Sequence, residues 1–133
     1  MDSHKISVAK ACLEGAESST MTFPQIVGTL MAAGFESYIV DFRRRVSTYY
    51  LPDGDSVELP THEIDGSVSP SFDSVTIQTA IKEAQQLVPD YTYRGFCRKV
   101  VAAGCAGYIV SFSGRRVLYF GRTAETHIEH FPS

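Results

Sequence analysis

The tetrapeptide His127-Ile128-Glu129-His130, near the end of the chain, carries the side-chain types that most often act as acids, bases or metal ligands. Because neighbouring side chains of a strand point to opposite faces, only His127 and Glu129 can act together on one side. Zinc spacing such as H-x-x-x-H is absent. We therefore predict either an acid/base or metal role for His127 and Glu129, or a solvated strand edge with structural hydrogen bonds only. Conceivable third ligands are His62, Glu63, Asp53 and Asp55.

Two arginine clusters form the second candidate for chemistry, because each falls in a predicted hairpin turn. Two cationic tips on one molecule would suit a phosphate or an acidic surface. The plainer interpretation is that charged tips keep the hairpins soluble and block edge pairing. The formal net charge of -3 at pH 7 disfavours nucleic acid as a partner. The candidate ligand-binding residues of these turns are Arg44, Arg45, Arg115 and Arg116.

Signatures of other catalytic and metal sites are absent from the sequence. The acidic turn at 52–55 lacks the ligand ladder of a calcium loop and predicts a hairpin turn instead. No Ser-His-Asp order, nucleophile elbow or glycine-rich phosphate loop occurs. Cys12, Cys97 and Cys105 lie in apolar runs without C-x-x-C spacing, which predicts reduced, buried thiols. We assign no metal ligands and expect no cofactor.

The elements that must position these residues occur twice, because the second half of the chain repeats the first at an offset of about seventy positions. Between 22–42 and 92–112, eight of twenty-one positions are identical, where ordinary composition would give about one or two. One inserted turn residue then aligns Arg44 with Arg115. The same shift aligns Val57 with Ile128, and we expect both in the core. The identical pairs are Thr22/Thr92, Ala32/Ala102, Ala33/Ala103, Gly34/Gly104, Tyr38/Tyr108, Ile39/Ile109, Val40/Val110 and Phe42/Phe112.

Each copy predicts two helices followed by a three-stranded meander. Thr22 and Thr92 are expected to cap the second helix of each copy, and Gly34 and Gly104 to end it in a left-handed conformation. Aromatic and β-branched runs after each glycine predict strands joined by short turns, and hence antiparallel pairing. The first helices are expected at 5–13 and 74–87, and the strands at 37–42, 46–51, 56–59, 107–112, 117–120 and 126–130.

The predicted fold is a single α+β domain, residues 1–133, in which two ααβββ units are related by a pseudo-twofold axis. The first repeat spans about 4–60, a linker about 60–72, and the second repeat about 73–131. Antiparallel strands form one or more sheets that pack with the helices. Because the strands carry apolar residues on both pleat faces, either two sheets pack together or the second face meets a partner, for example in a dimer. With Ile128 in the core, His127 and Glu129 are predicted on the opposite face.

Length and composition are those of an ordinary folded protein. The chain has 133 residues, of which 44% are hydrophobic and 20% charged, enough for one core without disulfides. The amino-terminal segment lacks the apolar stretch of a signal peptide, and no run approaches the roughly twenty apolar residues of a membrane span. With reduced cysteines, these features predict a cytoplasmic protein.

Two long segments, LMAAGFESYIVDFRRRVSTYYLPDGDSVELP and TYRGFCRKVVAAGCAGYIVSFSGRRVLYFGRTAETHIEHFP, carry a resemblance that covers most of the chain. They resemble a family of small bacterial and prophage proteins of unknown function, sometimes called phage envelope proteins. The resemblance implies a compact α+β fold and no established catalytic residues. An envelope role would require a membrane anchor or an export signal, and the sequence shows neither.

Two classes of function remain. We favour a non-enzymatic binding or interaction module with a protein partner or self-association, because no catalytic cluster is evident. The alternative is a small-ligand or metal-dependent enzyme whose site uses His127 and Glu129, with Arg115 or Arg116 as anchor for an anion. A concave pocket lined by His127 and Glu129 would favour the alternative, and a flat, wet strand would disfavour it.

Overall fold

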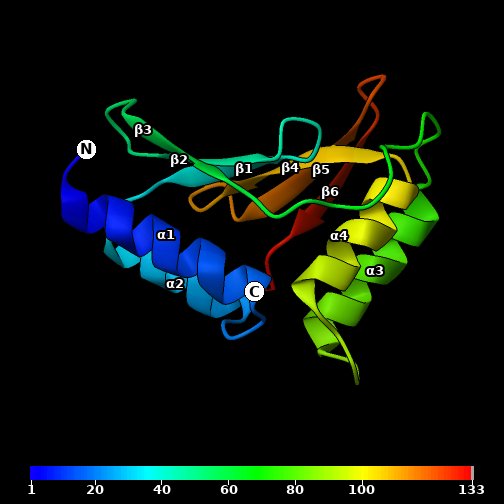
Figure 1. Cartoon of the computed structure of the whole chain (residues 1–133), viewed down its shortest axis with the longest axis horizontal. Coiled ribbons are helices and arrows are strands. Elements are labelled where there is room, and N and C mark those ends of the chain that lie inside the picture. The colour runs from blue at the N-terminus through cyan, green and yellow to red at the C-terminus, as the bar shows by residue number, and fades with distance from the viewer. Residues whose placement is uncertain (133) are drawn as a thin grey trace.

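Helices and strands follow one another in the order ααβββααβββ in the computed structural model, which describes residues 1–132 (Figure 1). The α+β class predicted from the sequence is confirmed. The helices are α1 (Ser3–Glu17), α2 (Phe23–Ala32), α3 (Ser74–Gln86) and α4 (Tyr93–Ala102). The strands are β1 (Ser37–Asp41), β2 (Val46–Tyr50), β3 (Ser56–Pro60), β4 (Cys105–Ser111), β5 (Arg116–Gly121) and β6 (Thr126–His130).

Local signals set the limits of the helices. The Thr22 hydroxyl accepts a hydrogen bond from the Gln25 amide, while the Gln25 side chain accepts one from the Thr22 amide, which forms the expected capping box of α2. Thr92 caps α4 by accepting from the Gly95 amide at 3.0 Å, without a capping box, because Gly95 has no side chain to donate or accept in return. α1 is longer than predicted because Asp2 caps it and accepts from the Lys5 amide at 2.8 Å.

The six strands form one antiparallel sheet in the order β3-β2-β1-β4-β5-β6. The sequence did not decide between one sheet and more than one. A single continuous sheet forms because β1 and β4 pair with each other at its centre. In this pair Ile39 lies opposite Ile109, the residue aligned with it, and Tyr38 opposite Val110 mirrors Tyr108 opposite Val40. A twofold axis between Ile39 and Ile109 would produce this register. Gene duplication itself stays a prediction.

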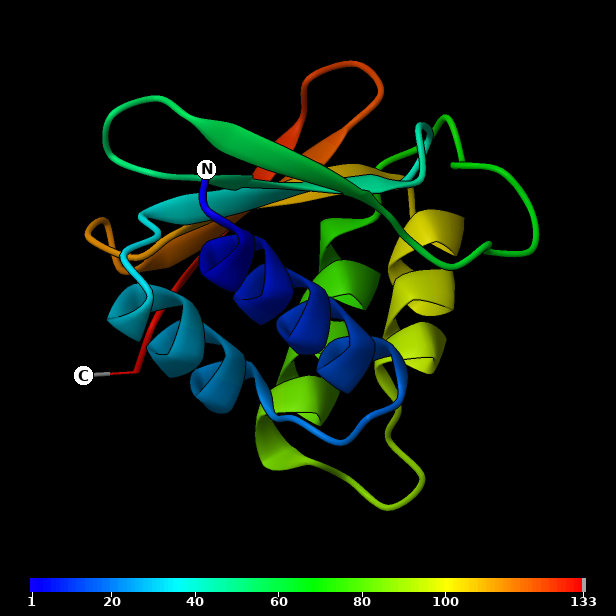
Figure 2. The ribbon, with the colours of Figure 1, turned by 60° about the vertical axis from the view of Figure 1, so that its left-hand side comes forward.

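All four helices cover the same face of the sheet, as one pair formed by α1 and α2 and a second pair formed by α3 and α4 (Figures 1 and 2). The core lies between them and the strands, where Leu30, Ile77, Val100 and Val110 are fully buried. None of these helices, in the part of the chain that the structure describes, has the length and hydropathy needed to cross a membrane.

Within residues 1–132, the opposite face of the sheet carries no helix. A row of apolar side chains, Ile39, Ile109, Leu118 and Ile128, crosses four neighbouring strands there in direct register. Ile128 is 43% exposed, so the prediction that it belongs to the core is wrong. A partner or second copy on this face stays a prediction.

The segment between the two halves makes more contacts than the predicted surface linker. Val68 is buried, and the Ser69 amide donates to the Val101 carbonyl at 3.2 Å. The Asp73 amide donates to the Ala103 carbonyl at 2.7 Å, immediately before α3. These contacts arise because the segment runs from β3 across the molecule to α3 and meets the carboxyl end of α4 on its way (Figure 1).

Candidate functional site: a cavity lined by tyrosines

A cavity of about 530 Å³ lies between the two helix pairs and the helix-covered face of the sheet. All four helices and every strand except β3 contribute to its walls, together with the loops that follow α1 and α3 and the segment after β6. The lining includes exposed residues such as Thr20 and Leu87, so the cavity opens to solvent beside these two loops. The volume is typical of sites that hold a small molecule.

The floor of the cavity follows from strand alternation. Tyr38, Tyr49, Tyr108 and Tyr119 all point toward the helices, because each sits at a helix-facing position of β1, β2, β4 or β5. Tyr38 and Tyr49 are directly opposite each other and stack with ring centroids 5.3 Å apart. Tyr108 and Tyr119 form the corresponding pair in the second half, at 5.5 Å. Tyr91 and Tyr93 complete a set of six tyrosines around the cavity.

The phenol groups of this lining are neutral at physiological pH. Burial raises the pKa of Tyr49 and of Tyr91 to about 12. Burial also holds the pKa of Tyr38, Tyr93 and Tyr108 well above the ordinary tyrosine value. The hydroxyl oxygens of Tyr93 and Tyr108 share a hydrogen bond of 2.6 Å. The walls therefore combine apolar ring faces with uncharged hydroxyls.

Ser47 is a buried polar residue of the cavity floor. Its side chain is fully buried at a helix-facing position of β2, two residues before Tyr49. The Ser47 hydroxyl lies close enough to the Tyr49 phenol to lower the pKa of Tyr49 against the larger effect of burial, but it makes no well-formed hydrogen bond among residues 1–132. A buried hydroxyl without a partner costs free energy. Because Ser47 also lines the cavity, a bound molecule with a polar atom would satisfy it.

Glu129 of β6 brings a formal negative charge to the cavity. Its Oε1 accepts a hydrogen bond from Gln85 Nε2 of α3 at 3.3 Å, and its Oε2 lies 3.5 Å from His127 Nε2. Among the lining residues that the structure describes, Glu129 alone has a formally charged side chain, apart from the titratable His130, and lysine and arginine are absent. Burial raises the pKa of Tyr119, with further contributions from Cys105 and from the Glu129 carboxylate, which is a diagonal neighbour of Tyr119 on the same face of β5 and β6.

His127 shares the face of Glu129 but does not line the cavity. Its ring packs against Tyr119 at 6.3 Å between centroids, and its Nε2 atom is buried without a hydrogen bond in the described part of the chain. The side chain instead borders a shallow depression formed with α3. The predicted pairing of His127 and Glu129 on one face is correct, whereas the predicted face is wrong: both point toward the helices, and Ile128 points away.

The prediction placed His127 and Glu129 on the wrong face because of the way the two halves of the sequence were aligned. The sequence alignment inserted one residue in the second hairpin, but the two hairpins have equal lengths, and Arg45 and Arg115, 70 positions apart, both have left-handed φ angles of 58° and 52°. The offset of 70 persists beyond the turns. The structural counterpart of Glu129 is therefore Leu59, which is buried, and not Glu58.

The two arginine turns do not form one site. The Phe42 amide, at the start of the β1–β2 turn, donates to the Ala106 carbonyl near the beginning of β4, whereas the Phe112 amide, at the start of the β4–β5 turn, donates to the Glu36 carbonyl just before β1. Because β1 and β4 are antiparallel, the two turns lie at opposite ends of the sheet, and a joint clamp on one phosphate is not formed. Arg44 and Arg45 instead pair with the exposed carboxylates of Glu58 and Glu63, at 3.4 and 3.0 Å.

The second turn does not line the cavity, although Arg115 contacts two residues, Phe131 and Pro132, that do. Arg115 donates to the Pro132 carbonyl at 3.1 Å and lies over the ring of Phe131. Arg116 pairs in register with His130, so its side chain points to the face opposite Glu129. Within residues 1–132, no three His, Cys, Asp or Glu side chains gather as metal ligands.

Sequence comparisons extend these observations to other proteins. Residues 14–129 match the family described as "Protein of unknown function (DUF1398)". The chain belongs to this family. Uncharacterized proteins of Mycobacterium bovis and Mycobacterium tuberculosis are 28% identical to it over 110 residues, which covers 82% of this chain and 66% of each relative. The chain thus matches slightly less than two thirds of the length of these relatives. The phage-envelope name and the prophage link stay predictions.

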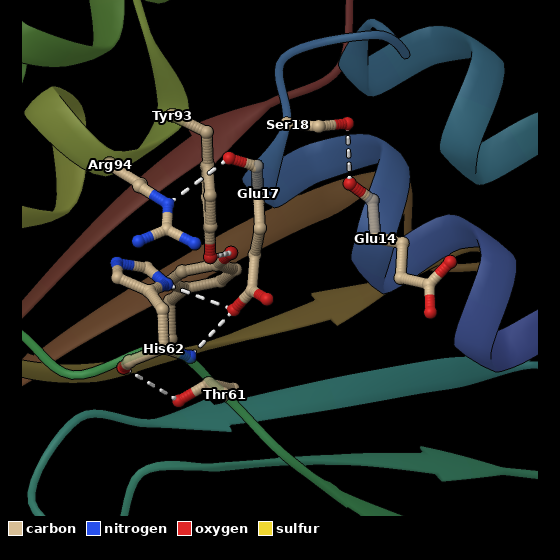
Figure 3. Close-up of polar contacts among 8 residues, drawn as sticks. Glu14, Glu17, Ser18, Thr61, His62, Tyr93 and Arg94 are labelled. Carbon is tan, nitrogen blue, oxygen red and sulfur yellow. Dashed lines mark hydrogen bonds and ion pairs between the residues drawn. The ribbon is translucent and has the colours of Figure 1, made fainter.

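A separate polar cluster lies behind the cavity wall (Figure 3). The Glu17 carboxylate accepts from the His62 amide at 2.7 Å and lies 2.9 Å from His62 Nδ1. Arg94 donates to the Glu17 carbonyl at 3.2 Å, and the His62 ring contacts the cavity residue Tyr93. The cluster joins the end of α1, the linker and the start of α4. The sequence offered His62 only as a conceivable metal ligand. Its contact with Glu17 was not predicted, because no local signal pairs two residues so far apart in the chain.

Proposed function

We propose that this protein binds a small, largely apolar molecule in the tyrosine-lined cavity and carries out no catalytic step. The observation that carries the proposal is the cavity itself. Ligand sites in proteins usually have volumes of about 300–1,000 Å³, mostly apolar walls and a few polar groups that orient the ligand. The 530 Å³ cavity, its six tyrosines and the Ser47 hydroxyl match each part of that description.

The aromatic lining supports a ligand with a ring or a flat apolar body. Tyrosine rings contribute contact area at a low cost in conformational entropy, and paired rings favour stacked or edge-on neighbours. Neutral phenol hydroxyls supply hydrogen bonds along the same walls. The small-molecule ligand replaces the protein partner that we favoured from the sequence. Protein association through the uncovered sheet face remains a separate prediction.

The groups near the cavity favour binding over catalysis. Cys12 borders the cavity, but burial raises the pKa of its thiol, which disfavours the reactive thiolate. Ser47 has no base within hydrogen-bonding distance among the described residues. The enzymatic alternative needs His127 and an arginine to join Glu129, whereas only Glu129 lines the cavity.

The test is direct binding of N-phenyl-1-naphthylamine, an uncharged dye that fluoresces strongly in apolar surroundings. We expect saturable binding to the full chain, measured with the dye excited directly. Ala84→Trp should weaken it at least about tenfold, because Ala84 of α3 lines the cavity and an indole would occupy part of it. Gln86→Trp is the matched control, since Gln86 is exposed on the same helix and outside the cavity.

Circular dichroism would establish that both variants remain folded. Absence of saturable binding to the unmodified chain would refute the proposal. Equal affinities of the dye for the two variants would also refute it, because the dye would then occupy another surface.

A further inference from the structure

We propose that the ligand is an organic cation, an amine or quaternary ammonium group on an apolar body, and that Glu129 binds its positive charge at the rim of the cavity. This inference rests on the proposed function and names the chemical class of the ligand. It follows from the charge of the lining, the surroundings of Glu129 and the comparison of the two halves.

Among the described residues, the formal charge of the cavity lining comes from one carboxylate. No lysine or arginine lines the cavity within residues 1–132, and its formal negative charge comes from Glu129. In surroundings of low polarity, one uncompensated carboxylate attracts a cation and repels an anion more strongly than it would in water. The cavity is therefore selective for the sign of the ligand's charge.

The Glu129 carboxylate has few partners within the described part of the protein. Gln85 donates one hydrogen bond to it, His127 Nε2 lies 3.5 Å away, and 24% of the side chain is exposed. A carboxylate accepts about four hydrogen bonds, so acceptor positions remain. Among the ion pairs of the described residues, Glu129 has no lysine or arginine partner. An ammonium group would supply both the charge and the donors.

Aromatic rings lie next to Glu129 in the cavity lining. Tyr119 and Glu129 both line the cavity and are diagonal neighbours on the same face of β5 and β6, because Tyr119 lies opposite His127 in the sheet. Ring faces of tyrosine attract cations that approach within about 6 Å of the ring centre. A carboxylate beside tyrosine rings is a combination that recognises ammonium groups, with the apolar body stacked on the cavity floor.

The two halves of the chain differ at the position of Glu129. The counterpart of Glu129 is Leu59, which is buried and lies outside the cavity lining. A carboxylate at this position of an edge strand replaces apolar packing and is not needed for the fold, since a leucine serves in the other half. A ligand that binds this carboxylate explains why Glu129 lies at the rim of the cavity.

The experiment compares three molecules that share a naphthalene ring: 1-naphthylmethylamine, 1-naphthylmethanol and 1-naphthylacetate, which are cationic, neutral and anionic near pH 7. Isothermal titration calorimetry with the full chain would measure each affinity. We expect the amine to bind at least about tenfold more tightly than the alcohol, as one charge-assisted hydrogen bond provides, and the acetate to bind most weakly.

The variants separate charge from shape. Glu129→Gln should weaken the amine about tenfold and leave the alcohol within about twofold. Glu129→Leu introduces leucine, the residue found at Leu59 in the other half, and should likewise weaken the amine while leaving the alcohol within about twofold. With two variants, a folding defect in one of them does not decide the result. Glu58→Gln removes a charge from the opposite edge strand, outside the cavity, and should change neither affinity.

Each outcome bears on a stated claim. If the alcohol binds in a manner sensitive to Ala84→Trp but the amine binds no better, the cation inference is overturned and the proposed function stands. Tightest binding of the acetate, or equal losses for amine and alcohol in Glu129→Gln, would also overturn the inference. If none of the three binds the unmodified chain, the proposed function itself fails.

Discussion

Gly34 and Gly104 end α2 and α4 with the same local sequence, Ala-Ala-Gly, and with φ angles of 98° and 96°. Alanine at either position must adopt a conformation that L residues avoid, at a cost of about 1–2 kcal/mol. Part of this cost is offset because alanine restricts the unfolded chain, by about 0.4–1 kcal/mol. At Gly34 an added Cβ meets only the end of the Lys5 side chain, 3.8 Å away. We expect Gly34→Ala to lower the free energy of unfolding by about 1 kcal/mol.

Gly104 differs through tertiary structure alone. A Cβ there would overlap the carbonyl oxygen of Ser71 and lie 2.8 Å from the Cα of Phe72, both in the linker backbone. Moving the linker would disturb the hydrogen bond of 2.7 Å from the Asp73 amide to the Ala103 carbonyl. Overpacking costs about 1–3 kcal/mol and a lost hydrogen bond about 1 kcal/mol. We expect Gly104→Ala to lower the free energy of unfolding by about 3–5 kcal/mol, and Gly104→Val by more.

Urea denaturation followed by far-ultraviolet circular dichroism would measure both variants. With a slope of about 2 kcal/mol/M, the midpoint should fall by about 0.5 M for Gly34→Ala and by about 2 M for Gly104→Ala. Equal slopes would show that both variants expose the same surface on unfolding, so that a shift in midpoint reports a change in stability. Equal midpoints for the two variants would refute the reasoning, because the loss would then come from the backbone conformation and not from the linker contact.

Two further predictions concern stability. Glu17→Ala should lower the free energy of unfolding by about 2 kcal/mol, because it removes the carboxylate that accepts from the His62 amide and contacts the His62 ring. Glu14 is exposed on the same helix, so Glu14→Ala should lower the free energy of unfolding by less than about 0.5 kcal/mol. Equal losses for the two variants in chemical denaturation would contradict this. From about pH 10 to 12, stability should fall as pH rises, since the folded-state pKa of Tyr49 and Tyr91 is about 12 and the unfolded chain releases these protons first, near pH 10. Phenolate absorbance of the native protein should then lag behind that of the unfolded chain, and coincident titrations would count against it.

Much of the secondary structure could be predicted because its signals are local. The threonine caps, the glycines that end α2 and α4, and the antiparallel hairpins each depend on contacts between residues close in sequence. The α+β class follows from the order of these elements. The candidate site was predictable only in part: the sequence singled out Glu129 for its side-chain type, but not the six tyrosines as one lining.

The prediction failed where the alignment favoured identical residues over equal hairpin lengths. Matching Arg44 to Arg115 required an inserted residue, whereas equal hairpin lengths make Arg45 the counterpart of Arg115. A shift of one residue along a strand exchanges its two faces, so the error moved Ile128 into the predicted core and Glu129 out of it. Only the register of β5 with β6 corrects it.

The sequence by itself determined two successive ααβββ units, because capping, turns and strand alternation are decided within a few residues of the chain. The tertiary structure decided that both helix pairs cover one face of a single sheet and leave a cavity of about 530 Å³ between them. It also decided that Glu129 of an edge strand reaches this cavity while Leu59 does not. The physical reason is that β1 pairs with β4 across the chain's midpoint, a contact between distant residues that no local signal encodes.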